Sequence, residues 1–217
     1  MMTSLFSSFD PSSNSTQMNW IMMMMPMIIM PMNFWLTKSR WNLLKKKIEM
    51  NLSKELSNST KHKEMLMMST SVFMIIMTMN LMSIFPYTFT PTAQMSVSIS
   101  LALPLWMMLM IYGWSKYTNS MFIHLLPVGT PTPLMPMMIM IETVGNVIRP
   151  ISLSVRLTAN MIAGHLMMTL LGNMNNTNTI PITMIMQMIL MSFESAISII
   201  QAYVFSTLIT LYSSEIP

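Results

Sequence analysis

Long apolar runs separated by short polar ones predict an all-α protein that crosses a membrane several times. Three runs have roughly the length of one span, at 20–36, 65–85 and 95–114, since a membrane helix needs about 20 residues. Two further runs, 134–171 and 180–212, are much longer. A helix of that length must tilt steeply, bend or break to fit a bilayer. We therefore expect three shorter spans followed by a C-terminal hairpin of two long, strongly tilted helices.

The polar segment between the first two runs, residues 38–63, is strongly basic. It holds eight of the eleven basic residues, namely Lys38, Arg40, Lys45, Lys46, Lys47, Lys54, Lys61 and Lys63. Its apolar residues recur at steps of three and four, at Trp41, Leu44, Ile48, Leu52 and Leu56. This spacing favours a helix lying on the membrane surface over 41–57, with a solvated loop as the alternative. Basic loops stay on the inner side of a membrane, which predicts an outer N-terminus and an inner C-terminus.

Composition supports the membrane assignment and removes several classes of function. Hydrophobic residues make up 53% of the chain and charged residues only 8%, whereas soluble domains carry about 25% charged residues. We therefore treat 1–217 as a single membrane-embedded domain. The chain has no cysteine, and its three histidines lie far apart in the sequence, so we expect no metal site and no cofactor. The 35 methionines are spread along the chain, which favours a packing role over copper binding.

Arg156 is the most informative single residue, because it interrupts an otherwise neutral apolar stretch, 151–171. A charged side chain at membrane depth costs at least ~2.5–3.5 kcal/mol on the mildest scales. Arginine does not escape this cost by losing its proton, since its pKa lies above ~12. Arg156 is therefore a permanent positive charge that needs a negative partner.

The other polar residues of the two long runs are spaced as if they shared helix faces. Glu142, Arg149 and Arg156 are seven residues apart, and at about 100° per residue a step of seven returns close to the same face. The same narrow face includes Asn146, Asn160 and Gly164. In the last run Gln187, Glu194 and Gln201 also recur every seventh residue. Two antiparallel helices would thus carry facing polar rows, with Glu142 ~21 Å from Arg156 at 1.5 Å per residue.

Two interpretations of these rows compete. Buried polar pairs such as Glu142–Arg149 hold helices together without further function. Alternatively, a buried carboxyl such as Glu194 and an imidazole such as His165 bind and release protons. A titratable row interrupted by one fixed positive charge is what a proton path with a barrier requires, because a proton cannot pass Arg156.

Other transport classes fit less well. A secondary cation transporter typically contains two similar halves, and no internal repeat is visible. A proton-conducting subunit of a respiratory enzyme typically uses lysines within its spans, which are absent here. A purely structural subunit would tolerate Arg156→Lys without loss of activity.

Several motifs carry a family resemblance over essentially the whole chain. They are Phe9-Asp-Pro11, Phe85-Pro-Tyr87, Leu101-Ala-Leu-Pro-Leu-Trp106, Tyr112-Gly-Trp114, the run from His124 to Pro131, Ile141-Glu-Thr143, Asn146-Val-Ile-Arg-Pro150, Val155 to His165, Glu194-Ser-Ala196, Gln201-Ala-Tyr-Val-Phe205 and Leu211 to Glu215. With these motifs the chain resembles the a subunits of mitochondrial F-type ATP synthases, of the type encoded in animal mitochondrial DNA.

The resemblance implies a role for each candidate residue. The two long helices would lie tilted against a rotating ring of c subunits, with Arg156 facing the ring carboxylate. His165 and Glu194 would belong to the proton inlet and Glu142 to the outlet, while Asn160 and Gln201 would be polar neighbours of the arginine. Protons would enter by an outer half-channel, load the ring carboxylate and leave by an inner one.

The resemblance also implies partners and a location. The partners would be the c-ring, the peripheral stalk, other membrane subunits and the lipid bilayer, with protons as the transported ion and no nucleic acid. The chain would not be catalytic on its own but part of the proton-transporting ATP synthase. It would be a multi-pass protein of the mitochondrial inner membrane, with its N-terminus in the intermembrane space and its C-terminus in the matrix.

Overall fold

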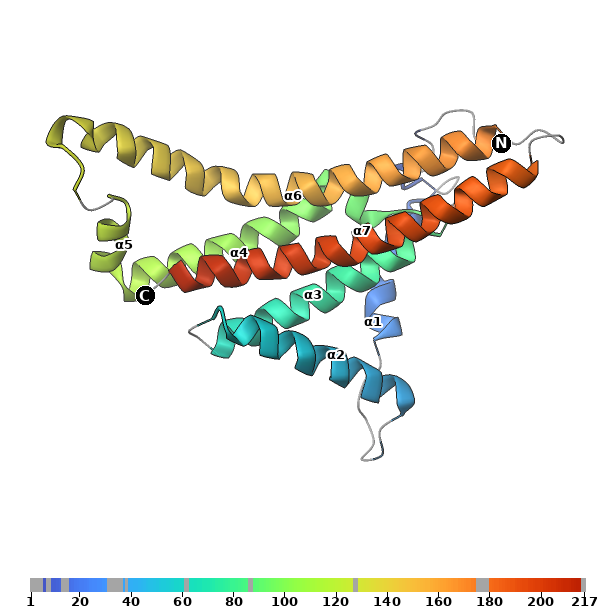
Figure 1. Ribbon diagram of the computed structural model, residues 1–217, viewed down its shortest axis with the longest axis horizontal. Coiled ribbons are helices and arrows are strands. Elements are labelled where there is room, and N and C mark those ends of the chain that lie inside the picture. Colours follow the sequence, from blue (N-terminus) through green and yellow to red (C-terminus); the bar gives the residue numbers. More distant parts are fainter. Residues whose placement is uncertain are drawn as a thin grey trace.

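The computed structural model describes residues 6, 9–12, 16–30, 37, 39–60, 63–85, 88–126, 129–174 and 180–215. Its regular elements are helical, which confirms the predicted all-α class. In chain order they are η2 (Met18–Met24), α1 (Met25–Ile29), α2 (Arg40–Ser57), α3 (Lys63–Ser83), η3 (Pro91–Ala93), α4 (Met95–Lys116), α5 (Thr118–His124), η4 (Thr132–Leu134), α6 (Met135–Asn173) and α7 (Ile180–Glu215). Figure 1 shows α6 running along most of the length of the molecule with α7 beside part of it, α3 and α4 against them and α2 crossing below.

Four helical stretches are long and apolar enough to cross a membrane: Glu64–Ser83, Met95–Lys116, Thr132–Asn173 and Ile180–Ser214. They coincide with four of the five predicted spans. For the fifth, predicted at 20–36, the structure has a shorter apolar helix, Met18–Ile29. This helix ends because Met30 has an extended backbone, with φ −66° and ψ 112°. Residues 31–36 lie outside the described part of the chain.

The C-terminal hairpin consists of two continuous helices. Helix α6 has 39 residues and α7 has 36, so they are roughly 58 Å and 54 Å long at 1.5 Å per residue. The hydrocarbon core of a bilayer is only about 30 Å thick, so upright straight helices of this length would not fit it, as expected for helices that tilt or bend. Pro150 lies inside α6 without ending it, and Figure 1 shows this helix bowed rather than broken.

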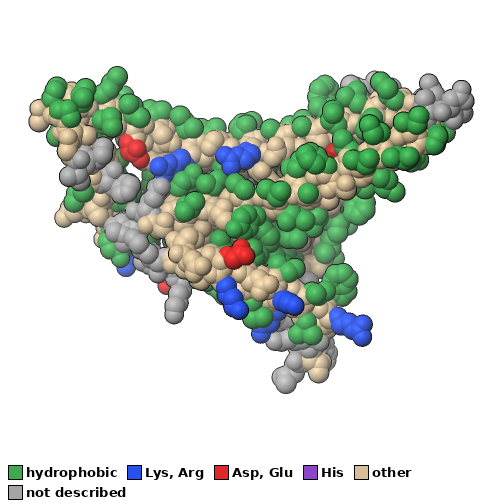
Figure 2. Space-filling view, in the orientation of Figure 1, with side chains coloured by type: hydrophobic (Ala, Val, Ile, Leu, Met, Phe, Trp, Pro, Cys, Tyr) green, Lys and Arg blue, Asp and Glu red, His purple; other side chains and the backbone are tan. Residues whose placement is uncertain are grey.

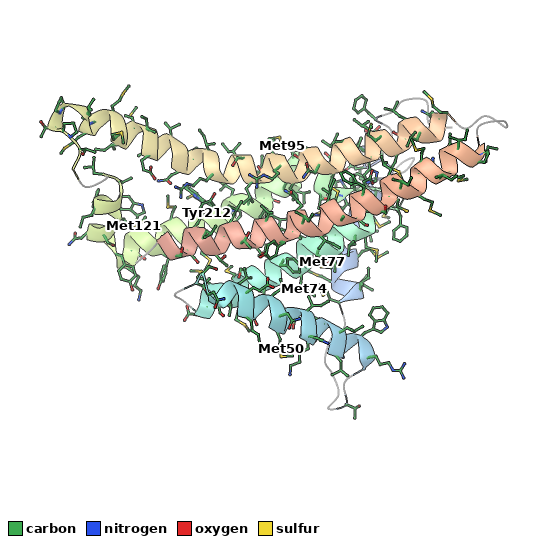
Figure 3. The ribbon with its side chains drawn as sticks, viewed as in Figure 1. Met50, Met74, Met77, Met95, Met121 and Tyr212 are labelled. Atoms are coloured by element: carbon green, nitrogen blue, oxygen red, sulfur yellow. The ribbon has the colours of Figure 1, made fainter. Side chains whose placement is uncertain are left out.

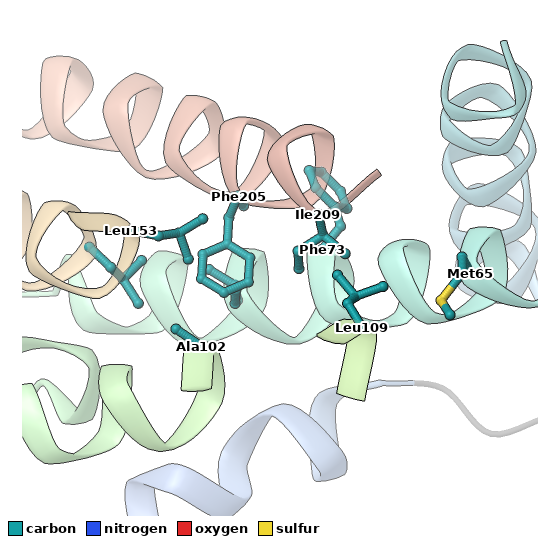
Figure 4. Packing of buried hydrophobic residues seen from close by; sticks show 10 residues of the cluster. Met65, Phe73, Ala102, Leu109, Leu153, Phe205 and Ile209 are labelled. Atoms are coloured by element: carbon teal, nitrogen blue, oxygen red, sulfur yellow. The ribbon is translucent and has the colours of Figure 1, made fainter. Parts of the chain in front are cut away.

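A buried apolar cluster joins α3, α4, α6 and α7 (Figure 4). Its members are Met65, Phe73, Ile76, Ala102, Leu109, Leu153, Leu157, Ala202, Phe205 and Ile209. On α6 the buried positions Leu153 and Leu157 are one turn apart, whereas Val155 and Arg156 beside them are exposed. Helix α6 thus packs with one face and leaves another face open, and Arg156 belongs to the open side.

The basic segment forms the predicted helix, α2, and its N-terminus is capped by Ser39, whose Oγ accepts a hydrogen bond from the backbone N–H of Asn42 at 3.3 Å. The apolar residues predicted to form one stripe on this helix differ in burial. Leu56 at its end is buried, while Trp41 is 76% exposed. Figure 2 shows basic side chains gathered around this helix. An amphipathic helix with free apolar and basic side chains suits a membrane surface, and its interfacial location stays a prediction.

The polar connector at 115–133 contains two short elements that the sequence pattern did not predict, α5 and η4. Among the described residues, the methionines are spread over several helices and do not gather at one site. Figure 3 labels Met50 on α2, Met74 and Met77 on α3, and Met121 on α5. Their dispersal over several helices supports their interpretation as packing residues.

Candidate functional site: a cavity between the long helices

A cavity of about 230 Å³ lies among α3, α6 and α7. Its walls are mainly apolar, and a few polar side chains reach it from all three helices. These are Asn80 from α3, Asn160 and His165 from α6, and Glu194, Ser198 and Gln201 from α7. The structure therefore brings four of the six predicted site residues to one cavity that is large enough for water.

His165 is buried, with 6% of its surface exposed. Its ring hydrogen-bonds the backbone of Ser83 on α3, and its Nε2 atom has no partner within the described part of the chain. The ring of Phe9 lies against it edge to face, with 6.2 Å between the ring centroids. The imidazole is thus restricted by contacts with α3 and with Phe9, and its Nε2 atom has no partner among the described residues.

Glu194 lies against α6 at Gly164. A Cβ atom added to Gly164 would come within 2.9 Å of both Cδ and Oε1 of Glu194, which is closer than van der Waals contact. The Oε1 atom is buried and has no hydrogen-bond partner among the described residues. Glycine is therefore required at 164 for the carboxyl group to fit beside the backbone of α6, in the cavity that His165 also lines.

Asn160 and Gln201 form the direct polar contact between the two long helices. The Nδ2 atom of Asn160 donates to Oε1 of Gln201 at 3.0 Å. This bond confirms that the predicted polar rows of α6 and α7 meet at this level. It also sets the relative position of the helices, since an amide pair inside a membrane keeps its hydrogen bond.

Arg156 lies one helical turn before Asn160 but outside this cavity. Its side chain is exposed, and among the described residues it makes no salt bridge. In particular, Glu194 does not neutralise it. Within the described residues, the permanent charge of Arg156 is therefore presented to the outside of the fold without an acidic partner.

Glu142 and Arg149 form a separate site nearer the start of α6. Arg149 Nη2 lies 3.7 Å from Glu142 Oε1, and both side chains are partly exposed. The guanidinium group of Arg149 also lies 5.0 Å from the centre of the Tyr212 ring on α7. Figure 3 shows Tyr212 between the two long helices. Glu142 does not line the cavity that holds His165 and Glu194.

Asn80 is a site residue that the sequence reasoning missed. It is completely buried on α3, and both polar atoms of its amide lack a partner in the described structure. Buried polar atoms are normally hydrogen-bonded, so these unpaired amide atoms beside the cavity make Asn80 a candidate site residue. The sequence feature that could have identified it is that Asn80 is the sole carboxamide side chain in the apolar run 65–85.

Comparison with known proteins agrees over nearly the whole chain. The family model described as ATP synthase A chain matches residues 16–214. ATP synthase subunit a of Locusta migratoria is 47% identical over 226 residues, covering 100% of both chains. That of Drosophila melanogaster is 46% identical and also covers 100% of both. That of Artemia franciscana is 46% identical over 99% of this chain and 100% of its own. The chain therefore belongs to the ATP synthase A chain family.

Proposed function

We propose that this chain provides two proton half-channels and a fixed arginine that faces the carboxylate of a c-ring. Membership of the family makes it a proton-translocating subunit in the membrane sector of ATP synthase, and a multi-pass protein of the mitochondrial inner membrane. The proposal concerns how its own residues handle the proton.

The unpaired, outward-facing charge of Arg156 carries the proposal. Exposure on the open face of α6 would be costly in lipid, and it is relieved if a carboxylate from another chain meets it there. In the proposed cycle Arg156 pairs with each ring carboxylate in turn. A protonated, neutral carboxyl releases the arginine and moves on with the ring. Because Arg156 keeps its own proton and repels others, protons do not leak from inlet to outlet.

The inlet is supported by the cavity that His165 and Glu194 share. A proton arriving from the intermembrane space would bind His165 at its free Nε2 and pass to the Glu194 carboxylate. Glu194 would then deliver it to the ring carboxylate and become ionised again. Asn80, with both amide atoms free of protein partners among the described residues, would hold water in this path. Asn160 and Gln201 would keep α6 and α7 at the spacing the transfer needs.

The outlet is assigned to Glu142, on the predicted matrix side of Arg156. A proton leaving the ring would reach the exposed inner part of α6 and pass over Glu142 to the matrix. The same topology has the N-terminus in the intermembrane space and the C-terminus in the matrix, following the basic segment at 38–63. The peripheral stalk would hold the chain still against the ring.

A second candidate for Glu142 is a structural role. Its salt bridge with Arg149 and the contact of Arg149 with Tyr212 would join the inner parts of α6 and α7. This candidate concerns Glu142 alone, because neither Arg156 nor Glu194 has such a partner among the described residues.

Replacement of Arg156 by lysine tests the central claim. Lysine lacks the planar guanidinium group that binds a carboxylate through two hydrogen bonds, and the low dielectric of a membrane favours its neutral form. We expect Arg156→Lys to abolish ATP-driven proton pumping in inverted membrane vesicles while the complex still assembles. Lys116→Arg, the reverse exchange at the end of α4, is the matched control and should pump normally. Near-normal pumping by Arg156→Lys would overturn the proposal.

A further inference from the structure

We infer that Phe9 is a positioning residue for His165, and that Gln94 holds Phe9 in place. The inference rests on the proposed role of His165 in the inlet. It assigns a supporting role to residues that lie far from the two long helices in the sequence. Phe9 contacts His165 in the part of α6 that leads toward the turn to α7. That is the end toward which His165 lies from Arg156.

The contact between the two rings has a defined geometry. Their centroids are 6.2 Å apart and the planes make an angle of 72°, an edge-to-face arrangement within the attractive range for aromatic pairs. The ring of His165 is also tied to the backbone of Ser83. Nε2 has no hydrogen-bond partner in the described structure. The backbone of Ser83 and the ring of Phe9 thus both restrict the imidazole, and neither contact occupies Nε2.

Phe9 is in turn held by the chain between α3 and α4. The side-chain Nε2 of Gln94 donates to the backbone carbonyl oxygen of Phe9 at 2.8 Å. Gln94 directly follows η3, whose residues Pro91, Thr92 and Ala93 are all buried. The hydrogen bond joins residues 85 positions apart and anchors a short segment that lacks long helical structure of its own. A second ring contact, Trp20 with Phe89 at 5.6 Å, ties η2 to the same connection.

This arrangement has a consequence for proton transfer. When Nδ1 carries the proton of the neutral ring, Nε2 is an acceptor. It binds a proton from water and passes one to the Glu194 carboxylate, after which the ring is neutral again. A ring flip would exchange the two nitrogens and interrupt this relay. The edge-to-face contact with Phe9 opposes the flip. Among the described residues, Glu194 is the charged residue that lines the same cavity as His165, and Asp10 follows Phe9 in the sequence.

Chemical labelling of His165 in the assembled complex tests the inference. Diethyl pyrocarbonate modifies unprotonated imidazole nitrogens, and peptide mass spectrometry reports the rate at His165 itself. In Phe9→Leu, which keeps an apolar side chain but removes the ring edge, we expect this rate to rise about 2- to 13-fold. That range is ~0.5–1.5 kcal/mol of aromatic pairing converted at RT of ~0.59 kcal/mol. Gln94→Leu should raise the rate as well, because the anchor of Phe9 is lost.

Three controls keep the test specific. Phe9→Tyr retains the ring edge and should label like the unchanged protein. Phe122→Leu makes the same exchange on α5, where the ring contacts Trp114 instead, and should also have no effect. Unchanged labelling of His165 in both Phe9→Leu and Gln94→Leu would overturn the inference. His165→Gln separates it from the proposed function: normal ATP synthesis in that variant would reject the inlet role, whereas the labelling rates would still report on Phe9.

Discussion

Gly164→Ala isolates the geometry of the proposed inlet with the smallest possible change. The added methyl group would lie 2.9 Å from Cδ and Oε1 of Glu194 and 3.3 Å from its Cγ. Ordinary contact of a Cβ atom begins at 3.4 Å. The carboxyl group must therefore withdraw from α6 by roughly 0.5–1 Å, given the usual separation of ~3.5–4.0 Å between carbon atoms.

The energetic balance predicts a folded but impaired protein. Overpacking of one methyl group costs ~1–3 kcal/mol, and replacing glycine by alanine inside a helix returns up to ~1 kcal/mol. The atoms that must move are the end of a flexible side chain bordering a cavity of about 230 Å³, so the cost falls at the low end. Misplacement of a reacting group by ~1 Å can slow a reaction by ~10²-fold. We expect at least a ~10-fold loss of proton-driven ATP synthesis with normal assembly.

The assay is ATP synthesis in membrane vesicles at a fixed proton gradient, normalised to the amount of assembled complex. Gly145→Ala is the matched control on the same helix, since a Cβ atom there would meet nothing within 4 Å in the described structure. It should leave the rate unchanged. If Gly164→Ala also synthesises ATP at the normal rate, the carboxyl group of Glu194 does not act at the position observed beside α6.

Three further variants test the remaining residues. Glu194→Gln keeps the size of the side chain but cannot bind and release a proton. ATP synthesis at modest driving force should therefore fall and partly recover when the intermembrane side is acidified. An unchanged dependence of synthesis on outer pH would make Glu194 structural. Asn80→Leu removes two unpaired buried atoms, and we expect thermal stability to be kept while proton-driven synthesis falls; unchanged synthesis would exclude water binding by Asn80 from the path. Glu142→Gln should slow turnover, make it sensitive to matrix pH and leave assembly normal. If Glu142 only pairs with Arg149, the single variant should instead assemble poorly, because the salt bridge between the two side chains is lost. Recovery of assembly and full proton flux on adding Arg149→Met would rule out its relay role.

The hydrophobic pattern alone determined where the membrane helices lie. The bounds of α3, α4, α6 and α7 follow the apolar runs to within a few residues, because a helix in lipid must satisfy its backbone internally and expose apolar side chains along its whole length. The first span was less certain, since an apolar run does not reveal that the backbone becomes extended at Met30. Residue spacing also placed Arg156, Asn160 and Gly164 on nearby parts of one helix, as 3.6 residues per turn requires.

Only the tertiary structure decided which of these residues meet. Spacing along α6 and α7 gives angular positions but not the relative shift of the helices, which the bond from Asn160 to Gln201 and the fit of Glu194 against Gly164 reveal. Asn80 and Phe9 reach the same region from other parts of the chain, a proximity that no local pattern encodes. The orientation of Arg156 away from Glu194 depends on which face of α6 the core covers. Sequence thus determines which side chains each helix carries, whereas packing between helices selects which of them line one cavity.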